Sequence, residues 1–242
     1  MVNLKNILAV VPARSGSKGL SDKNIKLLNG HPLLAWSILS AKRLGIQEVY
    51  LSTDSSDYAE VGKKYGASVP ELRPDYLSSD SSLDCDFLRH AIKIYCNSGK
   101  NFSHILHLRP TTPSRSVSVM QMALDQLKVY NSPYLRSCHP APESPMKWYY
   151  KRNNLAKQLS KEYNLNARDE NRQSYETVYI PNGYIDILDV EHFLKYNDLY
   201  QTEVLLFETE PVIEVDTKFE FDLLSALSQE NNADIYAELL NG

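Results

Sequence analysis

Residues Ile7 to Asn24 read ILAVVPARSGSKGLSDKN, and this stretch decides the fold class. Its first part, Ile7–Pro12, is a short apolar run of the kind that forms a strand buried on both faces of a parallel sheet. Its second part, Ala13–Asn24, is polar and carries glycines. Sheets of α/β proteins bind ligands in loops that follow buried strands in this way. We therefore expect an α/β protein with a ligand site directly after its first strand.

The same alternation continues along the chain, with short β-type runs followed by amphipathic stretches. The predicted strands are Ile7–Pro12, Glu48–Ser52, Ala67–Pro70, His104–Leu108, Tyr134–Cys138, Gly183–Leu188, Val204–Phe207 and Val212–Val215. The predicted helices are Leu33–Leu44, Ser55–Tyr65, one carrying Cys85 and Cys96, and two terminal helices near Glu220–Ser228 and Asn232–Leu240. Pro32 opens the first of these helices and Gly45 closes it, while Asp54 is the expected N-cap of the second. This order predicts a mostly parallel sheet covered by helices.

Composition narrows the classes of protein to consider. The 242 residues, 43% hydrophobic and 23% charged, are enough for one main core. A net charge of −4 gives no general attraction to nucleic acid or to an anionic membrane, so we expect neither as a partner. Three cysteines without a Cys-x-x-Cys pair predict neither a disulfide framework nor a zinc site. The first apolar run is too short for a signal peptide, so the cytoplasm is the expected location.

A polar, tyrosine-rich excursion from about Ala141 to Ile180 interrupts the strand and helix pattern. Half of the sixteen tyrosines of the chain lie between Tyr149 and Tyr200. Amphipathic aromatic side chains in a polar context are typical of an interface or of a ligand wall. The alternative is a tyrosine-rich edge of the core.

The loop after the first strand has the composition of a polyphosphate site. Gly16 and Gly19 allow backbone N–H groups to approach an anion, and Arg14 and Lys23 supply positive charge. The segment has neither the Gly-Lys-Ser/Thr order of a Walker loop nor a G-x-G-x-x-G dinucleotide motif. It predicts another kind of phosphate loop, the alternative being an exposed basic loop without function.

Two carboxylates near the C-terminus predict a metal site. Glu214 and Asp216 are two apart in a predicted strand, so their side chains point to one face, where they would repel each other unless a cation lies between them. Carboxylates that share a cation with substrate phosphates suit magnesium. The alternative is a solvated strand face. His104 and His107 point to opposite faces of their strand, which is unsuitable for joint metal binding, and we expect them to pack.

The opening strand, its loop and the Pro-led helix resemble the nucleotide-binding opening of CMP-acylneuraminate synthetases, the cytidylyltransferases that activate sialic and related nonulosonic acids. Other segments resemble landmarks of that family in their order and spacing. They are STD at Ser52–Asp54, LRP at Leu72–Pro74, SSDSS at Ser78–Ser82, LRPTTPSR at Leu108–Arg115, PNG at Pro181–Gly183 and EVDT at Glu214–Thr217. The resemblance implies a Rossmann-like nucleotide-diphospho-sugar transferase fold, a single domain over residues 1–242, and a protruding arm within residues 141–180 that supports a homodimer.

The resemblance also implies an activity, which is the magnesium-dependent transfer of CMP from CTP to the anomeric hydroxyl of a nonulosonic acid with release of pyrophosphate. It assigns catalytic roles to Arg14, Lys23 and Asp216 and metal binding to Asp216 and Glu214. The implied nucleotide-binding residues are Ala13, Arg14, Ser15, Gly16, Ser17, Lys18, Gly19, Lys23, Asn24, Arg73 and Asp84. The implied substrate-binding residues are Arg109, Thr111, Lys147, Arg172, Asn182 and Gly183.

The sequence departs from the family pattern at several of these places. Glu214 stands where the family usually has aspartate, which puts its direct contact with metal in doubt. Arg109 stands where relatives carry glutamine, and it has two open roles, pairing with a sugar carboxylate or bonding carbonyls of its own loop. Ile180 and Asp186 replace an arginine and a tyrosine of some members. The sugar acid is therefore open.

Arg73 has two open roles as well, one beside the nucleotide and one in a surface ion pair with Asp75 or Glu71. Two other functions also remain as alternatives. The first is a nucleotidyltransferase that uses another sugar acid or base, such as 3-deoxy-manno-octulosonate or GTP. The second is a nucleotide-binding homologue without catalysis.

Overall fold

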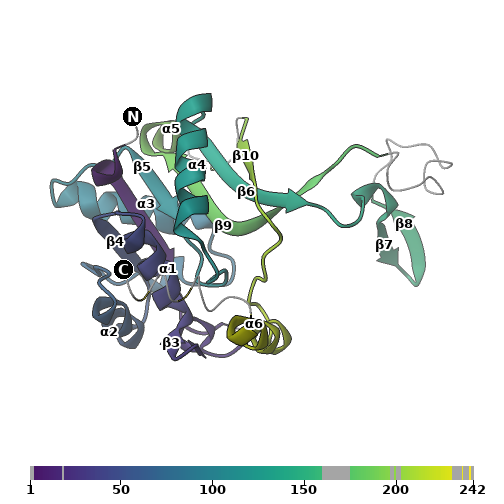
Figure 1. Ribbon diagram of the computed structural model, residues 1–242, viewed down its shortest axis with the longest axis horizontal. Coiled ribbons are helices and arrows are strands. Elements are labelled where there is room, and N and C mark those ends of the chain that lie inside the picture. The colour runs from purple at the N-terminus through teal and green to yellow at the C-terminus, as the bar shows by residue number, and fades with distance from the viewer. Residues whose placement is uncertain are drawn as a thin grey trace.

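A six-stranded sheet with strand order β10-β6-β9-β5-β1-β4 forms the centre of the protein (Figure 1). The computed structural model describes residues 3–17, 19–159, 175–196, 199, 203–230, 236 and 240. Its strands are β1 (Ile7–Pro12), β2 (Leu27–Leu28), β3 (His31–Pro32), β4 (Glu48–Ser52), β5 (His104–His107), β6 (Tyr134–Pro140), β7 (Tyr149–Arg152), β8 (Leu155–Gln158), β9 (Tyr179–Asp189) and β10 (Leu205–Glu208). Its helices are α1 (Leu33–Arg43), α2 (Ser56–Lys64), α3 (Asp84–Asn97), α4 (Val117–Tyr130), α5 (Val190–Tyr196) and α6 (Lys218–Glu230), with short 3-10 turns η1 (Leu4–Asn6), η2 (Lys23–Ile25), η3 (Asp75–Leu77) and η4 (Pro145–Lys147).

The sheet is mostly parallel, which confirms the predicted fold class. β1 lies between β4 and β5 and runs parallel to both, so that Ala9 is opposite Val49 on one side and Leu106 on the other. β10 runs parallel to β6. β9 alone among the six strands is antiparallel to its neighbours, β5 and β6. The carboxyl ends of β1, β4 and β5 consequently meet at one edge of the sheet.

Both faces of the sheet are covered by helices, which is why β1 reads as an uninterrupted apolar run. Its residues Ile7, Ala9 and Val11 belong to a core cluster that includes side chains of α1, α2 and α4. Leu8 and Val10 belong to a second cluster, which includes side chains of α3 and α5. All five of these side chains are at most 1% exposed. Burial on both faces selects apolar residues at every position of the strand.

A third apolar cluster joins the C-terminal part of the chain to the start of α1. Leu33 and Trp36 of α1 pack with Val215, Leu224 of α6 and Tyr236. The buried Val215 also donates its backbone N–H to the Thr111 carbonyl over 2.7 Å. These contacts hold Val215, and they therefore place its two neighbours, Glu214 and Asp216, beside the loops that follow β1 and β5.

The hairpin of β7 and β8 forms an arm that projects from the far ends of β6 and β9 (Figure 1). Trp148, Tyr149 and Tyr150 on this arm are 47%, 53% and 50% exposed. Tyr149 and Tyr150 therefore lie on an exposed surface, whereas Tyr184 of β9, in the same tyrosine-rich part of the chain, is 5% exposed and belongs to the core. Residues 160–174 of the predicted excursion lie outside the described part of the chain.

Three sequence-based predictions of local structure are wrong. Ala67–Pro70 forms no strand and makes a single parallel bridge, from Ser68 to Tyr50, because the chain leaves the sheet edge at once. Val212–Val215 is also not a strand, and hydrogen bonding to Thr111 with burial of Val215 holds it in place instead.

The third error is the N-cap of α2. Ser55 caps this helix, since its side chain accepts a hydrogen bond from the Tyr58 backbone N–H. The Asp54 carboxylate is engaged elsewhere, by Ser15.

The predicted helix Asn232–Leu240 falls largely outside the described residues, although Tyr236 and Leu240 are helical. Within the described ranges, no helix combines the length and the apolar character needed to cross a membrane.

Candidate active site

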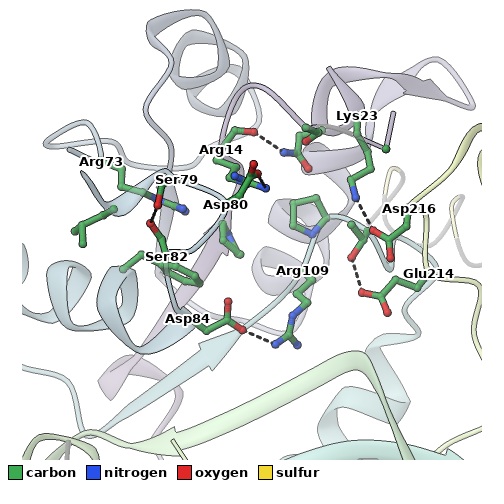
Figure 2. Close-up of a pocket in the computed structure, with 18 residues that line it drawn as sticks. Arg14, Lys23, Arg73, Ser79, Asp80, Ser82, Asp84, Arg109, Glu214 and Asp216 are labelled. Carbon is green, nitrogen blue, oxygen red and sulfur yellow. Dashed lines mark hydrogen bonds and ion pairs between the residues drawn. The ribbon is translucent and has the colours of Figure 1, made fainter. Parts of the chain in front are cut away.

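A cavity of about 560 Å³ opens at the carboxyl edge of the sheet (Figure 2). Its walls come from the loops after β1 and β5, from the segment between α2 and α3 with the start of α3, and from the residues before α6. The predicted site residues that line it are Arg14, Ser17, Gly19, Lys23, Asn24, Arg73, Asp84, Arg109, Thr111, Glu214 and Asp216. The fold thus brings together most of the residues that were separated in the sequence.

The loop after β1 is anchored by side chains at the start of α2 and by a hydrogen bond within the loop itself. The Ser15 backbone N–H and hydroxyl both donate to the Asp54 carboxylate, each over 2.7 Å. The Tyr58 hydroxyl donates to Asp22 over 2.9 Å, and the Asn24 side chain donates to the Arg14 carbonyl over 3.0 Å. Ser15 therefore uses both of its donors on Asp54.

The remaining predicted residues of this loop differ in their placement. Ala13 is fully buried and belongs to the core cluster below the loop. Ala13, Ser15 and Gly16 do not line the cavity, whereas Ser17 does. Lys18 lies outside the described residues.

Gly19 explains why this loop needs a residue without a side chain. A Cβ atom at Gly19 would lie 2.5 Å from the backbone oxygen of Asp216, a distance that would force one of the two segments to move. The loop and the Glu214–Asp216 segment are therefore in direct contact. This contact closes one wall of the cavity.

Two cations of the loop face carboxylates across the cavity. The Lys23 ammonium is 2.7 Å from the Asp216 carboxylate, and the Arg14 guanidinium is 2.7 Å from that of Asp80 (Figure 2). Arg14 also donates to the Ser78 carbonyl over 3.3 Å. The carboxylates of both pairs are exposed to solvent, so the pairs are weak and can be exchanged when a more highly charged anion arrives.

The two carboxylates predicted to bind metal both line the cavity, although their segment is not a strand. Thr111 donates its hydroxyl to Glu214 over 3.1 Å. Glu220, in the first turn of α6, accepts the backbone N–H groups of Asp216 and Thr217 over 2.8 and 2.7 Å. Thr217 and Glu220 together form a capping box. Glu220 thereby fixes the backbone that carries Asp216.

Glu214 and Asp216 are the two carboxylates of the cavity that could hold the predicted magnesium ion. No group of three or more His, Cys, Asp or Glu side chains arranged for a metal ion occurs among the described residues. Magnesium usually takes one or two carboxylates and completes its shell with water and substrate phosphates. Glu214 and Asp216, facing a cationic loop, match this pattern.

Arg73 is a buried part of the cavity wall. It is 4% exposed, donates to the hydroxyl and the carbonyl of Ser52 over 3.0 and 2.8 Å, and lies 4.5 Å from the ring centroid of Phe87. Burial lowers the pKa of Arg73 to about 10, which leaves it charged at neutral pH. Of its two predicted roles, burial excludes the surface ion pair.

Arg109 is held by two carboxylates of the protein. Its guanidinium donates to Asp186 and to Asp84, each over 2.7 Å. Burial acts to lower the pKa of Arg109, but the two carboxylates raise it above its ordinary value. The positive charge of Arg109 is therefore compensated within the protein, by partners that neither of its predicted roles included.

A buried polar layer lies beneath Arg109. Asp186 and His107 are both 1% exposed and face each other across the antiparallel pair of β9 and β5, with 3.9 Å between Oδ2 and Nδ1. Burial lowers the pKa of His107 to about 3, so its ring is neutral at physiological pH. For Asp84, burial raises the pKa, but the surrounding positive charges outweigh it and hold the pKa below the ordinary value.

The predicted substrate-binding residues are only partly brought together. Gly183, with a φ of 63°, lies beside the side chains of Thr112, Arg109 and Glu214. The buried Asn182 donates its amide to Thr209 over 2.7 Å. Lys147 is at the base of the arm, with its ammonium 5.5 Å from the Tyr175 ring, and does not line the cavity. Arg172 lies outside the described residues.

Sequence reasoning missed several residues of the site as individual contributors, among them Asp54, Asp80 and Arg115. Asp54 anchors the loop, Asp80 pairs with Arg14, and Arg115 supports the loop after β5. All three stand inside quoted motifs, STD, SSDSS and LRPTTPSR, so the motifs marked the right segments. Which side chain does what depends on contacts between distant segments, and single motifs do not show these.

Comparison with known proteins agrees with this geometry. A family model described as cytidylyltransferase matches residues 8–239. The N-acylneuraminate cytidylyltransferase of Escherichia coli O18:K1:H7 is 28% identical over 97% of this chain, which spans 56% of that protein. The CMP-N,N'-diacetyllegionaminic acid synthase of Legionella pneumophila is 31% identical over 93% of this chain and 97% of its own length.

A solved structure also shares the fold. The structure of CMP:2-keto-3-deoxy-manno-octonic acid synthetase complexed with CTP matches with a TM-score of 0.67 at 16% identity, over 93% of this chain and 99% of that one. The sheet, the cavity at its carboxyl edge and this match define a protein with the α/β fold of nucleotidyltransferases. Within that class, the chain belongs to the cytidylyltransferase family.

Proposed function

We propose that this protein transfers CMP from CTP to the anomeric hydroxyl of a nonulosonic acid of the sialic, legionaminic or pseudaminic type. The acceptor oxygen forms a bond to the α-phosphorus, the bond from that phosphorus to the β-phosphate bridging oxygen breaks, and pyrophosphate leaves with the electron pair. The hydroxyl proton is released to solvent. The names of the two relatives, both nonulosonic acid cytidylyltransferases or synthases, support this acceptor class.

The observation that carries the proposal is the arrangement of Lys23 and Asp216 in direct contact on the cavity wall, 193 residues apart in the chain. A cationic loop on one side and a carboxylate on the other supply the two kinds of group that a triphosphate with its metal ion requires. Lys23 is 13% exposed in its side chain, so its charge acts in a partly dehydrated site where it is stronger than in water.

Each residue has a separate task in this proposal. Arg14 and Lys23 bind the phosphates and stabilise the negative charge that develops on the departing pyrophosphate. Arg73, fixed by Ser52 and Phe87, contributes a third positive charge to the wall. Ser17, Gly19 and Asn24 shape the loop around the phosphates. Catalysis of this kind rests on positioning and electrostatic stabilisation.

We propose magnesium as the cofactor, held by Asp216 and Glu214 together with substrate phosphates. When bound, it would neutralise charge on the phosphate oxygens and orient the α-phosphate. The Thr111 hydroxyl holds Glu214 and the capping box at α6 holds Asp216, so both carboxylates are positioned before any ligand arrives.

Two further expectations complete the proposal. The exposed arm of β7 and β8, with its aromatic side chains, supports a homodimer in which the arm contacts a second subunit. The cytoplasm, where CTP is available, is the proposed location. The alternatives are a different sugar acid or base, or a nucleotide-binding homologue without catalysis.

Pyrophosphate release tests the proposal. CTP, UTP, GTP and ATP are each offered with magnesium and with a panel of nonulosonic acids and 3-deoxy-manno-octulosonate. Release that depends on CTP and on a nonulosonic acid is the expected result. Release with 3-deoxy-manno-octulosonate alone, or with another nucleotide, would reassign the acceptor or the base. Binding of nucleotide without release for any acceptor would favour the homologue without catalysis.

A further inference from the structure

Asp80 pairs with the guanidinium of Arg14, the group to which the proposed function assigns phosphate binding. Its carboxylate lies 2.7 Å from Nη2 of Arg14, and the Ser78 carbonyl accepts from Nη1 of the same guanidinium over 3.3 Å. Ser78 and Asp80 thus bind two nitrogens of Arg14, and Figure 2 shows Asp80 beside Arg14 on the cavity wall. Phosphate oxygens would take the same donors, because guanidinium binds carboxylate and phosphate with the same planar geometry.

The other carboxylates paired with cavity-lining cations have a separate explanation. Asp216, the partner of Lys23, faces the proposed metal, and Asp186, one partner of Arg109, is 1% exposed and part of the protein interior. Asp84, the other partner of Arg109, is 41% exposed but shares that arginine with the buried Asp186. Asp80 differs from Asp186 in being accessible, with a side chain that is 43% exposed, while that of Arg14 is 33% exposed. An exposed pair of this kind holds its partners weakly and can be exchanged.

We propose that Asp80 is an internal competitor for the phosphate site. Asp80 pairs with Arg14 in the empty enzyme, releases it when a triphosphate binds, and pairs with it again as pyrophosphate leaves. The negative charge of Asp80 opposes every phosphate that binds at Arg14, whether or not the side chain moves away. It therefore weakens the binding of both CTP and pyrophosphate. The benefit is a faster release of pyrophosphate, whose charge would otherwise keep it in a cationic site.

This inference rests on the proposed function, because it presumes that Arg14 binds phosphate. A competitor and a supporting residue change nucleotide binding in opposite directions when they are substituted. Loss of a residue that supports the site weakens nucleotide binding, whereas loss of a competitor strengthens it. An Asp80 that ligated the metal or contacted the nucleotide would also give weaker binding on substitution.

The test is the substitution Asp80→Asn, which keeps the shape of the side chain and removes its charge. Calorimetric titration measures the dissociation constants of magnesium–CTP and of magnesium–pyrophosphate, without turnover. Both constants are expected to fall about three- to tenfold at low salt, as expected for loss of one nearby opposing charge and of an exposed ion pair. The gain is expected to shrink at high salt, since exposed charges are screened.

Two further variants make the test specific. Asp75→Asn removes an exposed carboxylate in the neighbouring turn η3 and is expected to leave both constants within about twofold of the wild-type values. In an Arg14→Ala background, Asp80→Asn is expected to lose the part of its effect that comes from freeing Arg14, while the repulsion between Asp80 and phosphate remains; the double-mutant cycle measures this coupling. Circular dichroism confirms that each variant is folded.

The outcomes separate the two proposals. Wild-type protein that binds no nucleotide would contradict the proposed function and this inference with it. Wild-type binding with an Asp80→Asn variant that binds equally or more weakly would overturn the competitor role alone. An Asp80→Asn effect that persists in full without Arg14 would also overturn it.

Discussion

The loops that follow β1 and β5 use arginine in opposite ways. In the first loop, Arg14 is accessible and pairs with the exposed carboxylate of Asp80. In the second, Arg115 is fully buried and donates to the carbonyls of Arg109, Gly183 and Tyr184 and to the hydroxyl of Ser37. Both loops carry arginine at the cavity edge of the sheet. Burial and the nature of the acceptors decide which arginine is available to a ligand and which one supports the structure.

The largest expected effect comes from Arg115→Met. This substitution keeps an apolar stem but removes a donor from three buried carbonyls and one hydroxyl, of which the Arg109 carbonyl still accepts from Ser37 and Thr112. Burial lowers the pKa of Arg115 to about 9, which still leaves it charged at neutral pH, so the variant removes a bonded cation. The free energy of unfolding in urea is expected to drop by about 3 kcal/mol or more. A change below about 1 kcal/mol would mean that the carbonyls find other donors.

Lys23→Ala tests the first loop, whose cations are assigned to the ligand. Here turnover is expected to fall about 10²- to 10³-fold, since one preorganised charge at the departing phosphate is lost. The unfolding free energy is expected to change by less than about 1 kcal/mol, because the described partner of Lys23 is Asp216, whose side chain is 62% exposed. Steady-state kinetics and urea unfolding on the same samples check both parts.

The matched control for Lys23→Ala is Lys63→Ala. Lys63 also makes one ion pair, with Glu60 on the exposed face of α2, away from the cavity. Its loss is expected to leave turnover unchanged. Equal turnover in wild-type protein and Lys23→Ala would remove Lys23 from the mechanism.

Asp54→Asn tests whether anchoring from outside the cavity matters for the ligand. Asp54 accepts two hydrogen bonds from Ser15, and an amide can accept from one of these donors but offers no charge. The expected result is a rise of about tenfold in KM for CTP with a smaller change in kcat, because the loop loses its preferred position. Asp57→Asn, in the first turn of α2, is the control for charge alone. Identical kinetics in the two variants would show that the anchor has no function.

The smallest expected effect concerns His107, beneath Arg109. Burial lowers its pKa to about 3 in the folded protein, against an ordinary value of 6.5. Between these two pKa values the unfolded chain binds a proton at His107 that the folded chain does not. The free energy of unfolding of the wild type therefore falls as the pH drops below 6.5. His107 contributes at most about 1.4 kcal/mol per pH unit to this fall. His107→Gln is expected to reduce this slope. Parallel curves for both proteins between pH 6 and pH 4 would show that His107 does not contribute.

Much of the fold could be predicted from local patterns, because the elements near the site are strongly patterned. β1 and β4 agree with the predicted ranges residue for residue, since each is a short apolar run that ends at turn or capping residues. Ala67–Pro70 has a similar composition but forms only one bridge. Its composition fits a strand, yet the pairing that makes a strand depends on where the neighbouring segments run.

The sequence predicted which segments form the site, but not which side chains contact one another there. The phosphate loop, LRPTTPSR and Glu214–Asp216 all reach one cavity. The partners of Arg109 could not be found in this way, because Asp186 is 77 residues away and reaches Arg109 only through the antiparallel pairing of β9 with β5. Asp54 was misassigned as a cap for the same reason, since its partner Ser15 belongs to a different strand end.

A crystal structure with magnesium and CTP bound is the most direct test of the difference between the two loops. The expected result places phosphate oxygens on Arg14 and Lys23, releases Asp80 and Asp216 from these cations, and leaves Arg109 bonded to Asp84 and Asp186. A structure in which Arg109 turns to the phosphates, while Lys23 stays on Asp216 and Arg14 on Asp80, would contradict the assignment of the first loop to the ligand and of the second to support.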